Sequence, residues 1–126
     1  MDDKTKHYMQ GLALYGKQQH PAAIEEFRKA LAIEPDWTEA LAALAMAQMH
    51  AGLLDEAVAT GLRIVELDPN DAFAHTNLSM IYQRKGMIDE AEKEGAKARM
   101  LSWKQELKTN PGARPPGPAG SMPVQQ

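Results

Sequence analysis

The sequence predicts an all-α fold of three helix pairs, and three observations support this prediction. Similar residues recur at intervals of 34 positions along the chain. Within each interval, apolar residues lie three or four positions apart, which places them on one face of a helix. Prolines recur where the second helix of a pair is expected to end. A fixed period of about 20 to 50 residues is typical of arrays in which each repeat stacks on its neighbours.

The period is visible in single residues and in one short segment. The matching residues are Pro35 and Pro69, Gly52 and Gly86, and Ala23, Ala57 and Ala91. Leu-Asp-Glu-Ala at positions 54–57 also recurs as Ile-Asp-Glu-Ala at positions 88–91. We therefore expect one domain at residues 1–109, with repeats at about residues 4–37, 38–71 and 72–109.

Each repeat is expected to hold two helices. In the first repeat, Pro21 suits the opening turn of a helix, where an N–H group has no helical partner, and Pro35 ends that helix. Asp55 and Asp89 place negative charge at the positive end of later helices. The segment Asp-Pro-Asn-Asp at 68–71 offers capping side chains for the helix that follows it.

The last helix is expected to run past its repeat, because no helix breaker follows Gly95 until Pro111. We place its end near Lys108. The overhang carries a stripe of apolar residues on one face, namely Ala96, Met100, Trp103 and Leu107. The stripe either caps the end of the array or forms the seam of a homodimer, and both interpretations stay open.

Residues 110–126 are predicted to form a disordered tail. Eight of these 17 residues are proline or glycine, and too few are apolar to build a core. The segment Arg-Pro-Pro-Gly-Pro at 114–118 matches the short proline-rich sequences that bind grooves on other proteins, although such matches are common.

The composition excludes several classes of protein. The chain has 126 residues, of which 44% are hydrophobic and 25% charged, as expected for one globular domain or a short array. A net charge of −3 argues against binding to nucleic acid. There is no cysteine, and no apolar run is long enough for a signal peptide or a membrane span. We expect a cytoplasmic protein.

These spacings resemble the tetratricopeptide repeat family. In the first copy, small Gly11, Ala23 and Ala30, large Phe27 and terminating Pro35 match the family pattern. Small residues are needed where two helices cross about 8 to 10 Å apart. The resemblance implies a right-handed α-α superhelix of three helix pairs with an extended C-terminal helix.

The later copies depart from this pattern at one position. Gly61 and Gly95 stand where the first copy has Phe27, and glycine inside a helix costs about 0.5 to 1 kcal/mol relative to alanine. We expect Trp37 or Trp103 to fill the space that the missing ring leaves.

In this family the first helix of each pair lines a concave face, so the resemblance implies a protein-protein interaction adaptor. The expected groove residues are Tyr8, Met9, Leu12, Tyr15, Ala42, Met46, Met49, His50, Phe73, Asn77, Met80 and Arg84. Their apolar, methionine-rich character suits an apolar peptide or an amphipathic helix of a partner. The competing interpretation is that several of them are core residues between helices.

Chaperone-binding members of the family hold a terminal carboxylate with lysine, asparagine and arginine side chains. The corresponding positions here are Tyr8, Leu12, Ala43, Phe73 and Asn77, and none is cationic. A co-chaperone role of that kind is therefore not expected.

No enzyme activity, cofactor or metal is expected. The serines lie in no nucleophile motif, and the glycines form no phosphate-binding loop. His7 and His75 occupy equivalent positions two periods apart, so they are poor candidates for one metal site. The alternative function is a self-associating scaffold that uses the groove or the seam residues Met100, Trp103 and Leu107. The expected partners are a protein, a peptide or a second copy, and neither nucleic acid nor a membrane.

Overall fold

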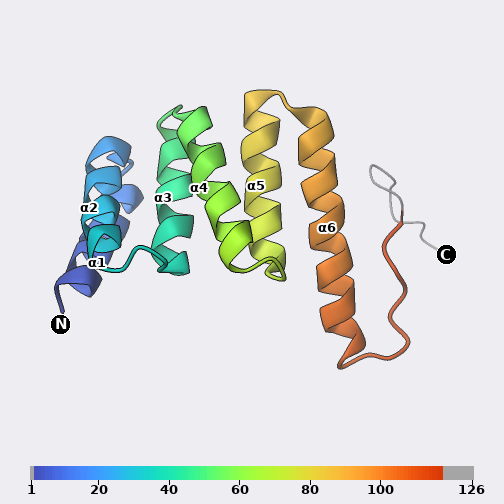
Figure 1. Cartoon of the computed structure of the whole chain (residues 1–126). Helices are drawn as coiled ribbons and strands as arrows, with labels where there is room; N and C mark the ends of the chain where they lie inside the picture. The colour runs from blue at the N-terminus through green and yellow to red at the C-terminus, as the bar shows by residue number, and fades with distance from the viewer. Residues whose placement is uncertain (1, 118–126) are drawn as a thin grey trace. The chain divides into compact units, whose positions relative to one another are not determined.

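The computed structural model describes residues 2–117, which form six α-helices and, within that range, no β-strand (Figure 1). The helices are α1 (Asp3–Gly16), α2 (His20–Ile33), α3 (Thr38–His50), α4 (Leu54–Leu67), α5 (Ala72–Lys85) and α6 (Ile88–Leu107). The predicted all-α fold is confirmed. The last helix ends one residue before the expected Lys108.

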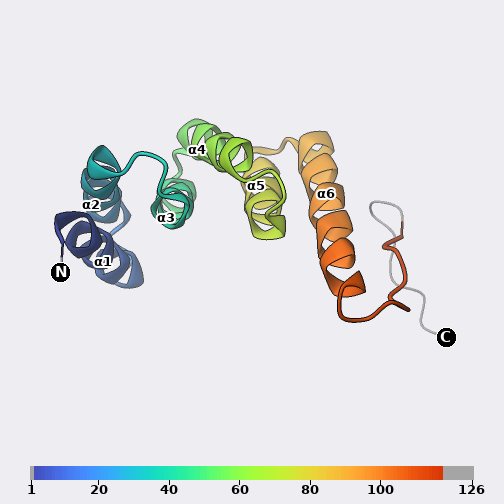
Figure 2. The same cartoon turned by 60° about the horizontal axis from the view of Figure 1, so that its bottom comes forward.

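The helices belong to two compact units, each with its own packing. The first unit, Met1–Leu67, contains α1 to α4, and the second unit, Asp68–Gln126, contains α5 and α6. Within each unit, consecutive helices run in opposite directions and are joined by short connections, as two views show (Figures 1 and 2).

The turn inside each helix pair repeats its backbone conformation. Gln18, Gly52 and Gly86 lie 34 residues apart and have φ angles of 62°, 82° and 84°. Glycine adopts this left-handed conformation readily, whereas a residue with a side chain loses about 1 to 2 kcal/mol there. The first repeat therefore holds a strained glutamine where the other two have glycine.

Phe27 organises the core of the first unit. Its ring is fully buried and lies against Gly11, where an added Cβ atom would come within 2.5 Å of the ring. The close crossing of α1 and α2 therefore depends on Gly11. The helix α3 packs on this pair through Leu44 and Ala47, which belong to the same buried cluster.

Trp37 closes the edge of the first helix pair. It precedes α3, and its ring centre lies 4.7 Å from that of Tyr8 on α1. The ammonium group of Lys4 lies 5.6 Å from the Trp37 ring centre, within the range of a cation–π contact.

The second unit is held by apolar packing and by one buried polar cluster. Leu78 and Ile81 on α5 are fully buried. Beside them, His75 Nδ1 lies 2.6 Å from a carboxylate oxygen of Glu94, and His75 Nε2 lies 2.8 Å from the backbone oxygen of Pro69. This cluster links α5 to α6 and to the segment that precedes α5.

The first unit contains a related cluster 68 positions earlier. His7 Nδ1 lies 3.3 Å from a carboxylate oxygen of Glu26, and the Lys29 ammonium lies 2.9 Å from the other oxygen. The His7 side chain is 30% exposed, whereas the equivalent His75 is 7% exposed. The same pair of residue types is therefore a partly buried contact in the first repeat and a buried one in the third.

Candidate partner-binding surfaces

In the first unit, α1 presents two exposed apolar side chains of the predicted groove. Met9 is 50% exposed and Leu12 is 38% exposed. Transfer of either apolar side chain from water into an interface would be favourable. Tyr8 and Tyr15 are half-buried, because their rings contact the aromatic side chains beside α1. The surface of α1 therefore combines exposed aliphatic groups with partly covered tyrosines.

The groove residues expected on α3 are divided between surface and core. Ala42 and Met46 are half-buried, and His50 is exposed. Met49 is only 2% exposed, so it is a core residue and not part of an accessible surface. The interpretation that some predicted groove residues belong to the core is thus correct for Met49.

In the second unit, α5 presents a highly exposed aromatic side chain. Asp71 caps α5 by accepting a hydrogen bond from the backbone N–H of Phe73, and the Phe73 side chain is 80% exposed. Met80 is 39% exposed, Asn77 is half-buried and Arg84 is exposed. Residues 73, 77, 80 and 84 are three or four positions apart, so they share one face of α5.

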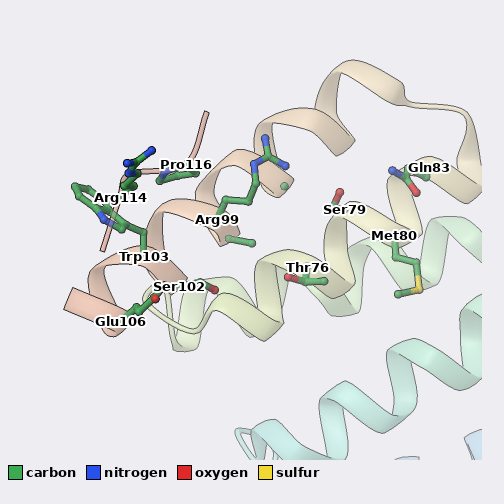
Figure 3. Close-up of a pocket in the computed structure, with 12 residues that line it drawn as sticks. Thr76, Ser79, Met80, Gln83, Arg99, Ser102, Trp103, Glu106, Arg114 and Pro116 are labelled. Atoms are coloured by element: carbon green, nitrogen blue, oxygen red, sulfur yellow. The ribbon is translucent and has the colours of Figure 1, made fainter. Parts of the chain in front are cut away.

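A pocket of about 560 Å³ lies between α5, α6 and the chain that follows α6 (Figure 3). Its lining includes Ser79, Gly95, Arg99 and Trp103. An added Cβ atom at Gly95 would meet Arg99 Nη1 at 3.4 Å and Ser79 Oγ at 3.5 Å. The expectation that a tryptophan fills the space at Gly95 is therefore wrong, because the space stays open and a guanidinium group lies nearest to it.

Comparison of equivalent positions in the first and third repeats explains why this pocket exists. Thr76, Gln83 and Gly95 of the second unit are equivalent to Tyr8, Tyr15 and Phe27 of the first, two periods earlier. In the first unit those three aromatic side chains pack with α3. In the second unit the same face carries small and polar residues and remains hollow. Comparison of the copies at these offsets was the signal that could have predicted the pocket.

Residues 110–117, which the sequence assigns to a disordered tail, return alongside α6 (Figure 1). The Trp103 Nε1–H donates a hydrogen bond of 3.0 Å to the backbone oxygen of Ala113. Arg114 and Pro116 lie beside Trp103 at one end of the pocket (Figure 3). Residues 118–126, with the rest of the proline-rich tail, lie outside the described residues.

The stripe expected on the α6 overhang is only partly covered. Trp103 and Leu107 are half-buried, while Met100 is 41% exposed. The chain's own tail covers part of Trp103 and leaves Met100 accessible.

Two further features concern metals and membranes. Among residues 2–117, no group of three or more His, Cys, Asp or Glu side chains is placed to hold a metal ion. Over the same range, no helix has the length and apolar character that a membrane span requires.

The helix pairs have small residues at their crossings, and their first helices expose apolar side chains. These features are typical of helical-repeat proteins that bind other proteins. The chain belongs to the tetratricopeptide repeat family: one tetratricopeptide repeat profile matches residues 8–72, and another matches residues 60–93. This membership supports a role as an adaptor or scaffold in protein-protein interaction.

Known proteins share the sequence pattern and the fold. The chain is 27% identical over 115 residues to photosystem I assembly protein Ycf3 of Synechococcus sp. (strain CC9605), covering 84% of this chain and 66% of that protein. The crystal structure of MamA matches with a TM-score of 0.77 at 24% identity, over 82% of this chain and 61% of MamA. YrrB, described as a TPR protein with an unusual peptide-binding site, matches with a TM-score of 0.77 at 26% identity, over 88% of this chain and 57% of YrrB. The chain thus spans less than two thirds of the length of each.

Proposed function

We propose that this protein is an adaptor whose first helices hold an apolar peptide or helix of a partner protein. The observation that carries the proposal is the exposure of large apolar side chains on α1 and α5, above all Phe73 at 80%. Burial of a phenylalanine side chain stabilises a complex by about 1.5 to 3 kcal/mol. An aromatic side chain left this exposed is therefore a strong candidate for an anchor in a partner interface.

The character of the remaining residues fits this kind of partner. Met9 and Met80 have unbranched, polarisable side chains that adapt to different apolar surfaces. Arg84 and Asn77 lie on the same face of α5 as Phe73 and can orient polar groups of a bound segment. The peptide-binding description of YrrB supports this proposal by analogy.

A second candidate function is self-association through α6. Met100 is 41% exposed on the same helix face as half-buried Trp103 and Leu107, which favours contact with another apolar surface. In this candidate the second copy would cover Met100.

The adaptor proposal is tested by affinity capture from the native host, comparing the wild-type chain with Leu12→Glu and Phe73→Glu. A carboxylate at either exposed position should reduce recovery of the partner at least tenfold, because burying an unpaired charge is costly. Helicity should not change, since both side chains already face solvent.

Ile33→Glu is the matched control, because Ile33 is 53% exposed but lies at the end of α2 and outside the proposed surface. It should capture the partner as the wild type does. If Leu12→Glu and Phe73→Glu recover the same partners as the control, the first helices do not form the binding surface.

A further inference from the structure

The groove between α5 and α6 is open at the place where the first unit holds a third helix. In the first unit, Phe27 of α2 and Leu44 of α3 belong to one buried cluster, and Leu31 of α2 packs against it. The residues of α6 equivalent to Phe27 and Leu31, two periods later, are Gly95 and Arg99. Both line the pocket of about 560 Å³, and no helix follows α6 among the residues described after it. The pocket therefore lies where the repeat pattern places a further helix.

The apolar part of this groove surrounds a hollow. Gly95 has no side chain to fill it, and Met80 on the α5 wall is 39% exposed beside it. Half-buried Trp103 closes the opposite end (Figure 3). A large apolar side chain of a bound segment would leave water on entering this hollow, and that transfer is favourable. The docked helix would thus supply the bulk that Phe27 supplies in the first unit.

The charged part of the groove is mainly cationic, although the whole chain has a net charge of −3. The pocket lining contains two arginines, Arg99 and Arg114, and one acidic residue, Glu106. Neither arginine forms an ion pair with another residue of the described part of the chain. The α5 wall contains Arg84 and Lys85 in its last turn and no acidic residue. The groove therefore favours a partner that carries negative charge.

Arg99 is placed to meet a carboxylate next to the hollow. Its Nη1 lies 3.4 Å from the position that a Cβ atom would take at Gly95. The Ser79 hydroxyl lies 3.5 Å from the same position, but it already donates a hydrogen bond of 2.6 Å to the backbone oxygen of Ala91. The guanidinium is therefore the donor that a group entering the hollow meets. Guanidinium pairs with carboxylate through two parallel hydrogen bonds.

We propose that the groove between α5 and α6 binds an acidic amphipathic helix of a partner protein. One large apolar side chain of that helix fills the hollow at Gly95, and a Glu or Asp one turn away pairs with Arg99. Residues three or four positions apart share a helix face, so one helix can make both contacts. The inference rests on the proposed adaptor function, because Met80 belongs to both surfaces, and it adds the charge of the partner.

A second copy of this chain fits the groove less well. In a head-to-tail stack, α1 of the next copy would take the place that α3 has in the first unit. The α1 residues equivalent to buried Ala40 and Leu44 of α3 are Lys6 and Gln10. Lys6 would bring positive charge towards Arg99, and like charges disfavour association. Charge therefore favours a partner with a different sequence.

The test uses two fluorescein-labelled, stapled synthetic helices of about 16 residues, which match α5 in length. Each has leucines on one face; one turn from the central leucine, the acidic helix has glutamate and the neutral helix has glutamine. Binding to the full-length chain is measured by fluorescence polarisation. We expect the wild type to bind the acidic helix about fivefold more tightly, because an exposed ion pair contributes only modestly.

Two variants separate the parts of the site. Arg99→Gln should remove the preference for the acidic helix, because it removes the charge that faces the carboxylate. Gly95→Leu fills the hollow and should weaken binding of both helices about fivefold or more. Arg28→Gln is the matched control, because Arg28 is an exposed arginine on α2 in the other unit, and it should bind as the wild type does.

Circular dichroism checks that each variant folds, and Arg99→Gln keeps the test valid if Gly95→Leu does not, since Arg99 is exposed. The inference is overturned if the wild type binds neither helix saturably, if Arg99→Gln keeps the preference, or if a second copy occupies the groove, seen as a dimer that Gly95→Leu dissociates. Loss of binding in Phe73→Glu with no effect of Gly95→Leu would reject the groove and leave the adaptor surface on α5 standing.

Discussion

At the scale of single residues, Gly11 and Gly95 show that a helical glycine can lie in tightly packed or in open surroundings. A Cβ atom at Gly11 would lie 2.5 Å from the Phe27 ring, which is fully buried and cannot move away cheaply. We expect Gly11→Ala to lower the free energy of unfolding by about 1 to 3 kcal/mol through overpacking. Urea denaturation followed by circular dichroism measures this change.

Gly95→Ala is the corresponding glycine-to-alanine substitution in the second unit and should not lower the free energy of unfolding. The nearest atoms to an added Cβ are the end of the Arg99 side chain and the Ser79 hydroxyl, at 3.4 and 3.5 Å. Alanine favours a helix over glycine by up to about 1 kcal/mol, so the variant should be as stable as the wild type or more stable. Equal loss of stability in both variants would contradict the packing assigned to Gly11.

The lowered pKa of Glu26 predicts that the free energy of unfolding depends on pH. Hydrogen bonds from Lys29 and then His7 hold the pKa of the Glu26 carboxyl below its ordinary value, although burial opposes them. Because the folded-state pKa is lowered, this contribution to stability is present above the ordinary glutamate pKa and is lost as the pH falls through the folded value. Glu26→Gln should therefore lose less stability than the wild type between about pH 5 and pH 3.

The measurement is urea denaturation of both proteins at several pH values across that range. A wild type and a Glu26→Gln variant that lose stability in parallel would show that the contacts of Glu26 with Lys29 and His7 contribute nothing to the acid response.

At the scale of elements, the segment that follows α6 is attached to that helix by a hydrogen bond. The Trp103 Nε1–H donates to the backbone oxygen of Ala113, so a chain that ends at Asn110 loses this bond. We expect the Trp103 fluorescence to shift to longer wavelength, with a loss of about 1 kcal/mol or less in the free energy of unfolding.

The substitution Trp37→Phe, placed in both the full-length and the shortened chain, leaves Trp103 as the source of tryptophan fluorescence. Identical emission spectra from the two chains would mean that residues 111–117 do not cover Trp103 in solution.

At the scale of the whole molecule, the two candidate functions differ in their dependence on concentration. An adaptor with an accessible surface keeps the mass of one chain, whereas a self-associating scaffold gains mass as the concentration rises. We expect light scattering after size exclusion to give the mass of one chain over a hundredfold range of concentration. A doubled mass that Met100→Glu abolishes would instead favour self-association through α6.

Some features of this protein follow from local sequence alone. Helix positions follow from the spacing of apolar residues such as Ile24 and Phe27, because that spacing reflects helix geometry itself. The end of α6 near residue 107 follows from the absence of helix breakers before Pro111. Gly11 is recognisable as a crossing point, since only a small residue lets two helices approach closely.

Other features follow only from the packing of distant segments. Met49 is one position from exposed His50, and its burial depends on which neighbours cover that side of α3. His20 and His50 share no repeat position and are 30 residues apart, so no pattern in the chain predicts that their rings lie 5.3 Å apart.

The sequence by itself determined the repeat, the helices and the residues that allow the helices to cross. The tertiary structure alone decided which side chains remain exposed, where the pocket at Gly95 opens and which histidines meet. The physical reason is that helix formation depends on neighbours within about four residues, whereas exposure and pocket formation depend on contacts between residues far apart in the chain.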